Sequence, residues 1–255
     1  MRILFINGSP RKVSNTKYVA DVIKGIITEK HMYIEYTDLF LKDATLFMCC
    51  GCRACFVNGE LYCPHKDDTL QIMEHMELAD AIIVGCPIYV EDVNGLTKNF
   101  IDRMAFNCHR PFLCGKPIFI YTVSGGNAST RGAKTLKNAF SSWGGNVVGI
   151  KNFALGNKIG TMGSAKEIKL NSYVDKIITK YEKNTVSLFS LISFGIQKAY
   201  WTKKDGIGCE YDKNYWVDKG WLDKNCKYYC KKNINMFQNL GGSLISVIIK
   251  RFYIK

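Results

Sequence analysis

Residues 1–16 of the chain read MRILFINGSPRKVSNT. The apolar run before Gly8 predicts a strand over residues 2–7, buried on both faces as a central parallel strand is. Apolar residues then recur at helical spacing over residues 16–28. The segment that joins the two, residues 8–16, is small and polar. A strand, a short polar loop and a helix in this order predict the first unit of a parallel α/β sheet.

The same alternation continues along the chain to about residue 180. Strands are expected at 2–7, 32–39, 81–87, 117–123 and 146–155, and helices at 16–28, 67–76, 94–104, 128–143 and 165–181. This order predicts an α/β fold with a doubly wound, five-stranded parallel sheet, which is typical of flavodoxin-like proteins. In such sheets ligands bind beyond the carboxyl ends of the strands. The loops to inspect are therefore residues 8–16, 87–94 and 124–127.

Composition sets the limits of the remaining interpretation. The chain has 255 residues, 47% hydrophobic and 22% charged, which is globular composition. We expect a domain over residues 1–184 with a cysteine-rich insertion at 49–63, and a mainly helical extension over 185–255. The extension carries 12 Lys+Arg against 5 Asp+Glu, a net charge of +7, and is rich in aromatic residues.

Targeting and partner signals are sparse. No apolar run approaches the roughly 18 residues of a membrane span, and the N-terminus lacks a cleavable leader pattern, so we expect a cytoplasmic protein. The net charge of +13 fits nucleic acid, a membrane surface or anionic cofactors. Because no nucleic-acid-binding motif is visible, we interpret it as a solvated basic surface and expect no nucleic-acid partner.

The loop at residues 8–16 is rich in groups that bind a phosphate dianion. Ser9, Ser14 and Thr16 offer hydroxyls, Asn15 an amide, and Arg11 a bidentate charge. The helix that follows adds free N–H groups and the positive end of its dipole. The alternative is a strand–helix turn capped by Ser14 or Asn15, which needs no ligand. Neither a Walker P-loop nor a GxGxxG fingerprint occurs here, which disfavours ATP and Rossmann-type NAD binding.

Three motifs together resemble a known family. GSPRKVSNT at 8–16 resembles the opening of NAD(P)H-dependent FMN reductases and related flavodoxin-like quinone reductases. CPIYV at 86–90, followed by GLTKNFIDR at 95–103, is similar to the loop that holds the isoalloxazine ring and to the helix after it. Ser124-Gly125-Gly126 resembles the flavin-edge loop. The resemblance covers about residues 1–180.

This resemblance implies FMN as cofactor and NAD(P)H as electron donor. It assigns the phosphate to Ser9, Arg11, Ser14, Asn15 and Thr16, and the ring to Pro87, Ile88, Tyr89, Val90, Ser124, Gly125 and Gly126. Tyr89 could equally be a packing aromatic at a strand end. We interpret Asp102 and Arg103 as a structural pair on their helix, and the resemblance names no catalytic residue.

The chain contains 11 cysteines, four of them within residues 49–55. Cys49, Cys52, Cys55 and Cys63 form C-x2-C-x2-C-x7-C, and four thiolates are what a [4Fe–4S] cluster requires. Gly51 permits a sharp turn between them. The spacing resembles the compact motif of the iron–sulfur flavoproteins, a branch of the same superfamily. The alternatives are a zinc site and redox-active thiols near the flavin, and Cys50 makes the first ligand ambiguous.

The other cysteines and the extension have weaker signals. Cys86, Cys108 and Cys114 are expected to be small buried hydrophobes, and Cys226-x3-Cys230 is a weak metal pattern. Residues 189–200 and 244–252 could each form an amphipathic helix. Such helices could lie on an anionic membrane surface, but we favour packing on the flavin domain or on a second subunit.

The sequence therefore predicts an FMN-dependent oxidoreductase that passes electrons from NAD(P)H, with or without a [4Fe–4S] cluster, to a small-molecule or protein acceptor. The alternative is a flavodoxin-like electron carrier between protein partners that does not turn over NAD(P)H, since one fold serves both roles. We expect a homo-oligomer, either a dimer or a tetramer.

Overall fold

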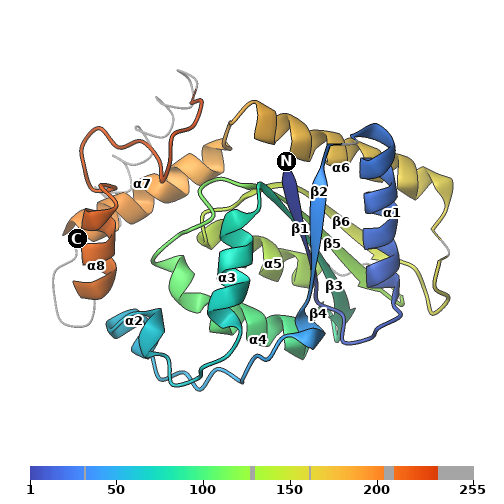
Figure 1. Ribbon diagram of the computed structural model, residues 1–255, viewed down its shortest axis with the longest axis horizontal. Helices are drawn as coiled ribbons and strands as arrows, with labels where there is room; N and C mark the ends of the chain where they lie inside the picture. Colours follow the sequence, from blue (N-terminus) through green and yellow to red (C-terminus); the bar gives the residue numbers. More distant parts are fainter. Residues whose placement is uncertain (32, 127–129, 161, 204–209, 235–255) are drawn as a thin grey trace.

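The structure is a computed structural model that describes residues 1–31, 33–126, 130–160, 162–203 and 210–234 (Figure 1). Its centre is a parallel sheet in the order β2-β1-β3-β5-β6. These strands are β1 (Arg2–Asn7), β2 (Glu35–Phe40), β3 (Ala81–Tyr89), β5 (Pro117–Ser124) and β6 (Asn146–Ala154). All four pairings between them are parallel. The expected α/β class and five parallel strands are confirmed.

Helices cover both faces of this sheet (Figure 1). One face is covered by α1 (Asn15–Lys30) and α6 (Ser164–Glu182), and the other by α3 (Thr69–Leu78), α4 (Gly95–Arg103) and α5 (Thr130–Ser142). Strand β1 shows why both faces are buried. Ile3 and Phe5 enter the core beneath α1 and α6, whereas Leu4 and Ile6 enter the opposite core, as the two-residue period of a strand requires.

A sixth, two-residue strand departs from the expected sheet. Strand β4 (Asp92–Val93) pairs antiparallel with the end of β3, which extends β3 to Tyr89. At the other end of the fold, β2 begins at Glu35, not at residue 32. The chain turns there through a backbone hydrogen bond from Ile34 N to His31 O (3.1 Å). As an edge strand with exposed residues, β2 lacks the continuous apolar run that defines the start of a central strand.

The connections carry short helices. These are η1 (Leu41–Asp43), α2 (Ala54–Val57), η2 (Glu60–Tyr62) and η3 (Ala105–Cys108). The first three lie in the long connection from β2 to α3, which also holds the cysteine-rich segment.

The C-terminal segment, residues 185–234 as described, contains α7 (Leu188–Lys203) and α8 (Glu210–Asp218). It has an apolar cluster of its own, built largely from Phe194, Trp201, Trp216, Trp221 and Tyr229. Helix α7 confirms the helix expected at 189–200, and α8 was not expected. The helix expected at 244–252 lies outside the described residues. In the part of the chain that is described, no helix has the length and apolarity to cross a membrane.

Helix α8 packs against α2, far from α1 (Figure 1). Trp216 Nε1 also donates a hydrogen bond to the backbone oxygen of His109 (2.7 Å). The C-terminal segment therefore contacts the domain on the side that carries the cysteines.

Candidate functional site

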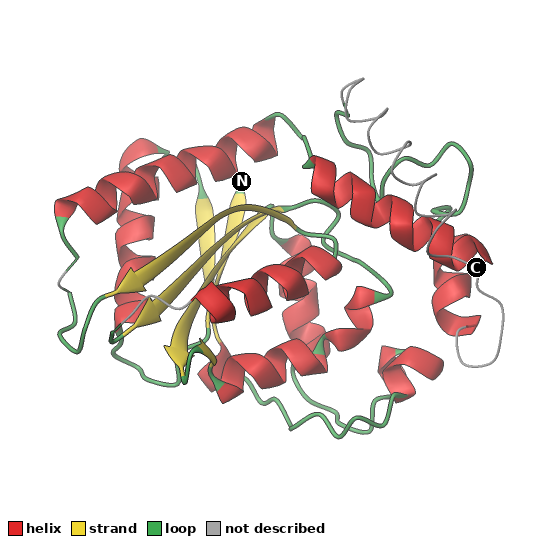
Figure 2. Cartoon of the chain, turned by 180° about the vertical axis from the view of Figure 1, so that it is seen from behind, coloured by secondary structure: helices red, strands yellow, loops and turns green. Residues whose placement is uncertain are grey.

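The three loops expected to bind ligands follow strands that end at one edge of the sheet. Asn7 pairs with Gly85, which in turn pairs with Tyr121, so β1, β3 and β5 end side by side. Figure 2 shows the arrowheads of the parallel strands gathered at that edge. The loops after these strands are residues 8–14, 90–91 and 125 onwards. Because the strand order reverses between β1 and β3, this edge is where doubly wound folds bind ligands.

The first loop ends at a capped helix. Ser14 has an extended backbone, and its side chain accepts a hydrogen bond from Lys17 N (3.1 Å), which makes it the N-cap of α1. The earlier part of the loop is folded on itself, because Ser9 N donates to Asn7 Oδ1 (2.9 Å) and Arg11 N donates to Ser9 Oγ (3.2 Å). Ser9, Ser14 and Thr16 are buried, whereas Arg11 is exposed.

Asn15 is engaged with the protein. Its amide donates to the backbone oxygens of Gly156 and Lys158, each at 3.2 Å, so it ties α1 to the segment after β6. Its Oδ1 is buried and has no hydrogen-bond partner among the described residues. The oxygen of a side-chain amide only accepts hydrogen bonds. Asn15 is therefore suited to accept from a hydroxyl and not to donate to a phosphate.

Two residues that the sequence analysis did not assign to the site close the first loop. Asn94 is the N-cap of α4, and its Nδ2 also donates to Gly8 O (2.7 Å). A Cβ on Gly8 would lie 2.2 Å from Thr97 Oγ1, so only glycine fits against α4 here. The pattern Asn94-Gly-Leu-Thr97 is a capping signature that could have indicated this contact.

The second loop is a tight hairpin. Ile88 pairs with Val93 and Tyr89 pairs with Asp92, which leaves Val90 and Glu91 as the turn. Both turn residues have positive φ, 48° and 67°, the backbone of a type I′ turn. A β-branched residue is strained in this region, and Val90 is also 96% exposed. Strain and exposure at one position are typical of a ligand-contacting turn.

The remaining ring-contact candidates differ in exposure. Tyr89 is 39% exposed, and Pro87 and Ile88 are half-buried. Ser124 Oγ donates to the backbone oxygens of Gly126 and Phe153, both at 3.4 Å. A Cβ on Gly126 would meet open space, so this glycine is not required by contacts within the described chain.

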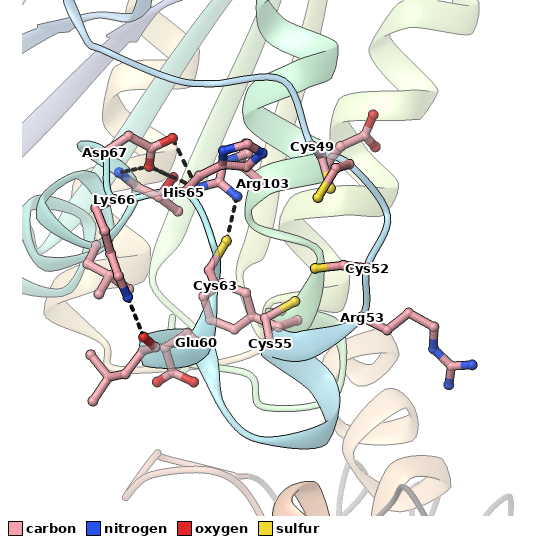
Figure 3. Close-up of a pocket in the computed structure, with 16 residues that line it drawn as sticks. Cys49, Cys52, Arg53, Cys55, Glu60, Cys63, His65, Lys66, Asp67 and Arg103 are labelled. Carbon is pink, nitrogen blue, oxygen red and sulfur yellow. Dashed lines mark hydrogen bonds and ion pairs between the residues drawn. The ribbon is translucent and has the colours of Figure 1, made fainter.

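The cysteine-rich segment runs beside α4. Figure 3 shows the side chains of Cys49, Cys52, Cys55 and Cys63 directed toward a shared space. Positive φ at Gly51 (67°) and at Arg53 (63°) turns the chain between them. The expected turn at Gly51 is confirmed, and the one at Arg53 was not expected. All four thiols, with Cys50, line a cavity of about 250 Å³.

Helix α4 and residues 67–68 fasten this segment. Asn99 Oδ1 accepts from Cys49 N (3.1 Å), and Asn99 Nδ2 donates to Leu46 O (3.1 Å). Arg103 donates through NH1 to Cys63 Sγ (2.9 Å) and through NH2 to both carboxylate oxygens of Asp67 (2.9 and 3.0 Å).

The interpretation of Asp102 and Arg103 as a pair with each other is wrong. Asp102 forms an ion pair with Lys98 (2.5 Å), one helical turn earlier. Arg103 instead pairs with Asp67, whose side chain is buried. Burial opposes the charge of this carboxylate, but hydrogen bonds from Arg103 and Thr69 outweigh it and lower the pKa of Asp67. Neighbouring helix positions face about 100° apart, which is why adjacent residues rarely pair.

A buried ionic network joins the C-terminal segment to the cysteine segment. Arg110 lies on the ring of Tyr211 and forms an ion pair with Asp212 of α8. Its NH2 group donates to Cys55 O (2.7 Å) and to Glu60 Oε2 (3.0 Å). Asp212 also accepts from His109 Nδ1 (2.6 Å). No local sequence pattern indicates this network, because its partners are about 50 and 100 residues apart.

The cysteine cavity offers thiols as donors to a metal centre. Burial raises the pKa of Cys55, and the charges of Cys63, Cys49 and Cys52 add to it. A bound cation reverses this effect by stabilising thiolates. Within the residues described, no three His, Cys, Asp or Glu side chains are grouped closely enough to hold one metal ion. In a [4Fe–4S] cluster each thiolate binds a different iron, so the ligands stand further apart than around one ion.

One family model and several known proteins are similar to this chain. The family model described as NADPH-dependent FMN reductase matches residues 1–160. An iron–sulfur flavoprotein of Archaeoglobus fulgidus is 42% identical over 103 residues, which are 40% of this chain and 48% of that protein. A second protein of that name and organism is 28% identical over 229 residues, 87% of this chain and 100% of its own. An iron–sulfur flavoprotein of Clostridioides difficile is 29% identical over 186 residues, 71% of this chain and 78% of its own.

Solved structures show the same fold at low identity. An NADH:FMN oxidoreductase in apo form has a TM-score of 0.50 and 19% identity, and covers 70% of this chain and 89% of its own. A flavone reductase has a TM-score of 0.55 and 17% identity, and the match covers 71% of this chain and 63% of the flavone reductase chain.

Proposed function

Because the chain belongs to the NADPH-dependent FMN reductase family, we propose that it takes electrons from NAD(P)H on a bound FMN and passes them to a small-molecule or protein acceptor. We propose further that the passage uses a [4Fe–4S] cluster held by Cys49, Cys52, Cys55 and Cys63. The observation that carries the proposal is the first loop, where a capped helix and a buried set of hydroxyls lie at the switch point of the sheet.

The residues of this loop fit the phosphate of FMN. The first N–H groups of a helix have no acceptor within it. At α1 the Ser14 side chain accepts from the N–H of Lys17. Arg11 is exposed beside them and supplies the charge. Ser9 is held by Asn7, and Gly8 is held by Asn94, so hydrogen bonds within the protein fix the loop. Such a preformed site spends little binding energy on ordering.

The two other loops fit the flat ring. The turn at Val90 and Glu91 projects from the same edge, with Tyr89 partly exposed behind it. Ser124 ends the neighbouring strand β5, and Gly125 and Gly126 follow it. All three residues present little side-chain bulk. In this arrangement Pro87, Ile88, Tyr89 and Val90 would contact one side of the ring, and residues 124–126 its edge.

The cysteine cavity fits the proposed cluster. Its four thiols converge, Arg103 donates a hydrogen bond to Cys63, and the relatives described above are called iron–sulfur flavoproteins. When bound, the flavin accepts a hydride and the cluster carries single electrons. The chain itself supplies position and charge: Asn99 and Asp67 hold the segment, and Arg103 stabilises a thiolate.

The phosphate site can be tested with riboflavin, which is FMN without its phosphate. We expect Arg11→Ala to weaken FMN binding about tenfold, the loss of one charge-assisted hydrogen bond, and to leave riboflavin binding unchanged. Lys12→Ala is the matched control, because Lys12 is an exposed cation in the same loop to which no contact is assigned. Equal affinities of the parent protein for FMN and riboflavin would contradict the assignment.

Anaerobically purified protein tests the proposed electron donor and the proposed cluster. Bleaching of the flavin absorbance by NADH or NADPH supports the oxidoreductase, whereas bleaching only by reduced ferredoxin supports an electron carrier. Iron and acid-labile sulfide should fall in Cys52→Ser and Cys55→Ser and stay at the parent level in Cys226→Ser, whose thiol lies in the C-terminal segment. The same iron content in all four proteins would reject the cluster.

The homo-oligomer, a dimer or tetramer, stays a prediction that light scattering can check.

A further inference from the structure

Two cysteines outside the proposed sites lie against each other. Cys114 precedes β5 in the domain, and Cys230 lies near the end of the described C-terminal segment, 116 residues later. The Cys230 thiol donates to the backbone oxygen of Cys114 (3.0 Å), and both side chains pack against the same apolar cluster. Both are free thiols and half-buried.

The backbone holds this pair in place. Cys114 has a φ of 48° and Gly115 a φ of 71°. A Cβ on Gly115 would lie 2.6 Å from Val186 Cγ1, so the C-terminal segment packs tightly on this turn. A non-glycine residue with positive φ is held only where its surroundings enforce it. The proximity of the two thiols therefore follows from tertiary packing on both sides of the pair.

Small molecules can reach the pair. Cys114 and Cys230 line a cavity of about 480 Å³ together with Lys116, Lys232, Asp80 and Glu182. Lys232 is held by Asn184 Oδ1 (2.8 Å), and Lys116 by Ala79 O (2.7 Å). Two ammonium groups thus stand at fixed positions beside the sulfurs. The volume is of the size that small-ligand pockets have.

Charge distribution favours Cys230 as the more reactive thiol. The neighbouring Cys114 thiol lowers the pKa of Cys230, and Lys232 and Lys116 lower it further, although burial acts the other way. The Cys114 oxygen also opposes ionisation, because it accepts a hydrogen bond from the protonated form. For Cys114 the same contact with Cys230, together with burial, raises the pKa. A thiolate is the nucleophile in thiol–disulfide exchange.

We propose that Cys230 and Cys114 form a redox-active dithiol that reacts with low-molecular-weight disulfides. The Cys230 thiolate attacks one sulfur of a disulfide RSSR. A bond forms between Cys230 and that sulfur, the RS–SR bond breaks, and RS⁻ leaves and takes up a proton. Cys114 then loses its proton to solvent and attacks Cys230 Sγ, which releases the second RS⁻. The two protein thiols are oxidised by two electrons, and RSSR is reduced to two RSH.

The product is a covalent link between the domain and the C-terminal segment. In a reducing compartment such a disulfide is transient, as redox-sensing disulfides are. The reaction requires neither FMN nor the cysteine cluster, so it can be tested separately from the proposed function.

The experiment uses the full-length protein and oxidised glutathione. After exposure the thiols are blocked with iodoacetamide, and disulfides are mapped by mass spectrometry of peptides. We expect a Cys114–Cys230 disulfide in the parent protein and a glutathione mixed disulfide at Cys230 in Cys114→Ser. We expect no modification of Cys114 in Cys230→Ser. Cys226→Ser should behave as the parent, because the Cys226 thiol donates to Tyr228 O (3.3 Å) and does not line this cavity.

The rate of thiol alkylation can be measured on the parent protein, so this test does not depend on the folding of any variant. We expect iodoacetamide to label Cys230 on the order of tenfold faster than Cys226, because the nearby Lys232 and Lys116 favour the Cys230 thiolate. Labelling of Cys230 no faster than Cys226 would overturn the proposal. Oxidation confined to residues 49–63, with Cys114 and Cys230 still reduced, would overturn it as well.

Discussion

The ion pair between Arg110 and Asp212 allows a quantitative prediction about the C-terminal segment. Both side chains are 2% exposed. Removal of one partner from a buried pair costs about 3–5 kcal/mol, because the other charge stays buried. Asp212→Asn keeps the shape of the side chain, and Glu60 still contacts Arg110. We therefore expect a loss at the lower end, about 3 kcal/mol of unfolding free energy.

Urea unfolding followed by tryptophan fluorescence is the appropriate assay. Three of the four tryptophans, Trp201, Trp216 and Trp221, lie in the cluster around α8, so the signal reports mainly on this segment. Far-UV circular dichroism reports on the whole chain. The fluorescence transition should move to lower urea and separate from the dichroism transition, if the C-terminal segment unfolds before the sheet.

Asp21→Asn is the matched control. Asp21 pairs with Lys17 one helical turn away, but the side chains are 45% and 43% exposed. Exposed helix pairs contribute only about 0.3–0.5 kcal/mol. If Asp212→Asn lost no more stability than Asp21→Asn, the reasoning that links α8 to the cysteine segment through a buried charge would be refuted.

Three further predictions concern single residues. Burial opposes the charge of His109, but the contact with Asp212 outweighs it and raises the pKa of His109 to about 9 from 6.5. The stabilisation of the fold by charged His109 is thus full below pH 6.5 and disappears as pH rises through 9. His109→Gln should therefore remove this part of the pH dependence of the unfolding free energy, measured by urea unfolding. Gly8→Ala should destabilise the fold by about 1–3 kcal/mol through its clash with Thr97, measured by thermal unfolding, whereas an unchanged melting temperature would contradict the clash. Val90→Gly should raise stability by about 1 kcal/mol by removing strain and weaken FMN binding in a fluorescence titration; unaltered affinity would exclude Val90 from the ring site.

The fold was predictable because its signals are local. The strand at residues 2–7, the Ser14 cap and the alternation of strands and helices are each read within a few residues, and parallel sheets with short connections leave few topologies. Strand β4 was not predictable. Its turn places Val90 and Glu91 at positive φ, whereas the turn residues expected for such hairpins are Asn and Gly.

The candidate site was predictable in its composition more than in its contacts. The spacing of the four cysteines and the position of the first loop depend on neighbours in sequence. By contrast, the bonds from Arg103 to Cys63 and from Arg110 to Asp212 join residues 40 and 102 positions apart. No periodicity encodes such pairs, so only tertiary structure shows them.

Helix α4 connects the first loop to the cysteine segment. Asn94 at its start contacts the first loop, and Asn99 and Arg103 further along contact the cysteine segment. Nine residues at 1.5 Å per residue span about 13.5 Å, within a continuous hydrogen-bonded rod. The first loop and the cysteine segment are thus held at a separation that the length of one helix sets. A single-residue insertion there would rotate Arg103 by about 100° away from its thiol, so the hydrogen bond to Cys63 depends on the length of this helix.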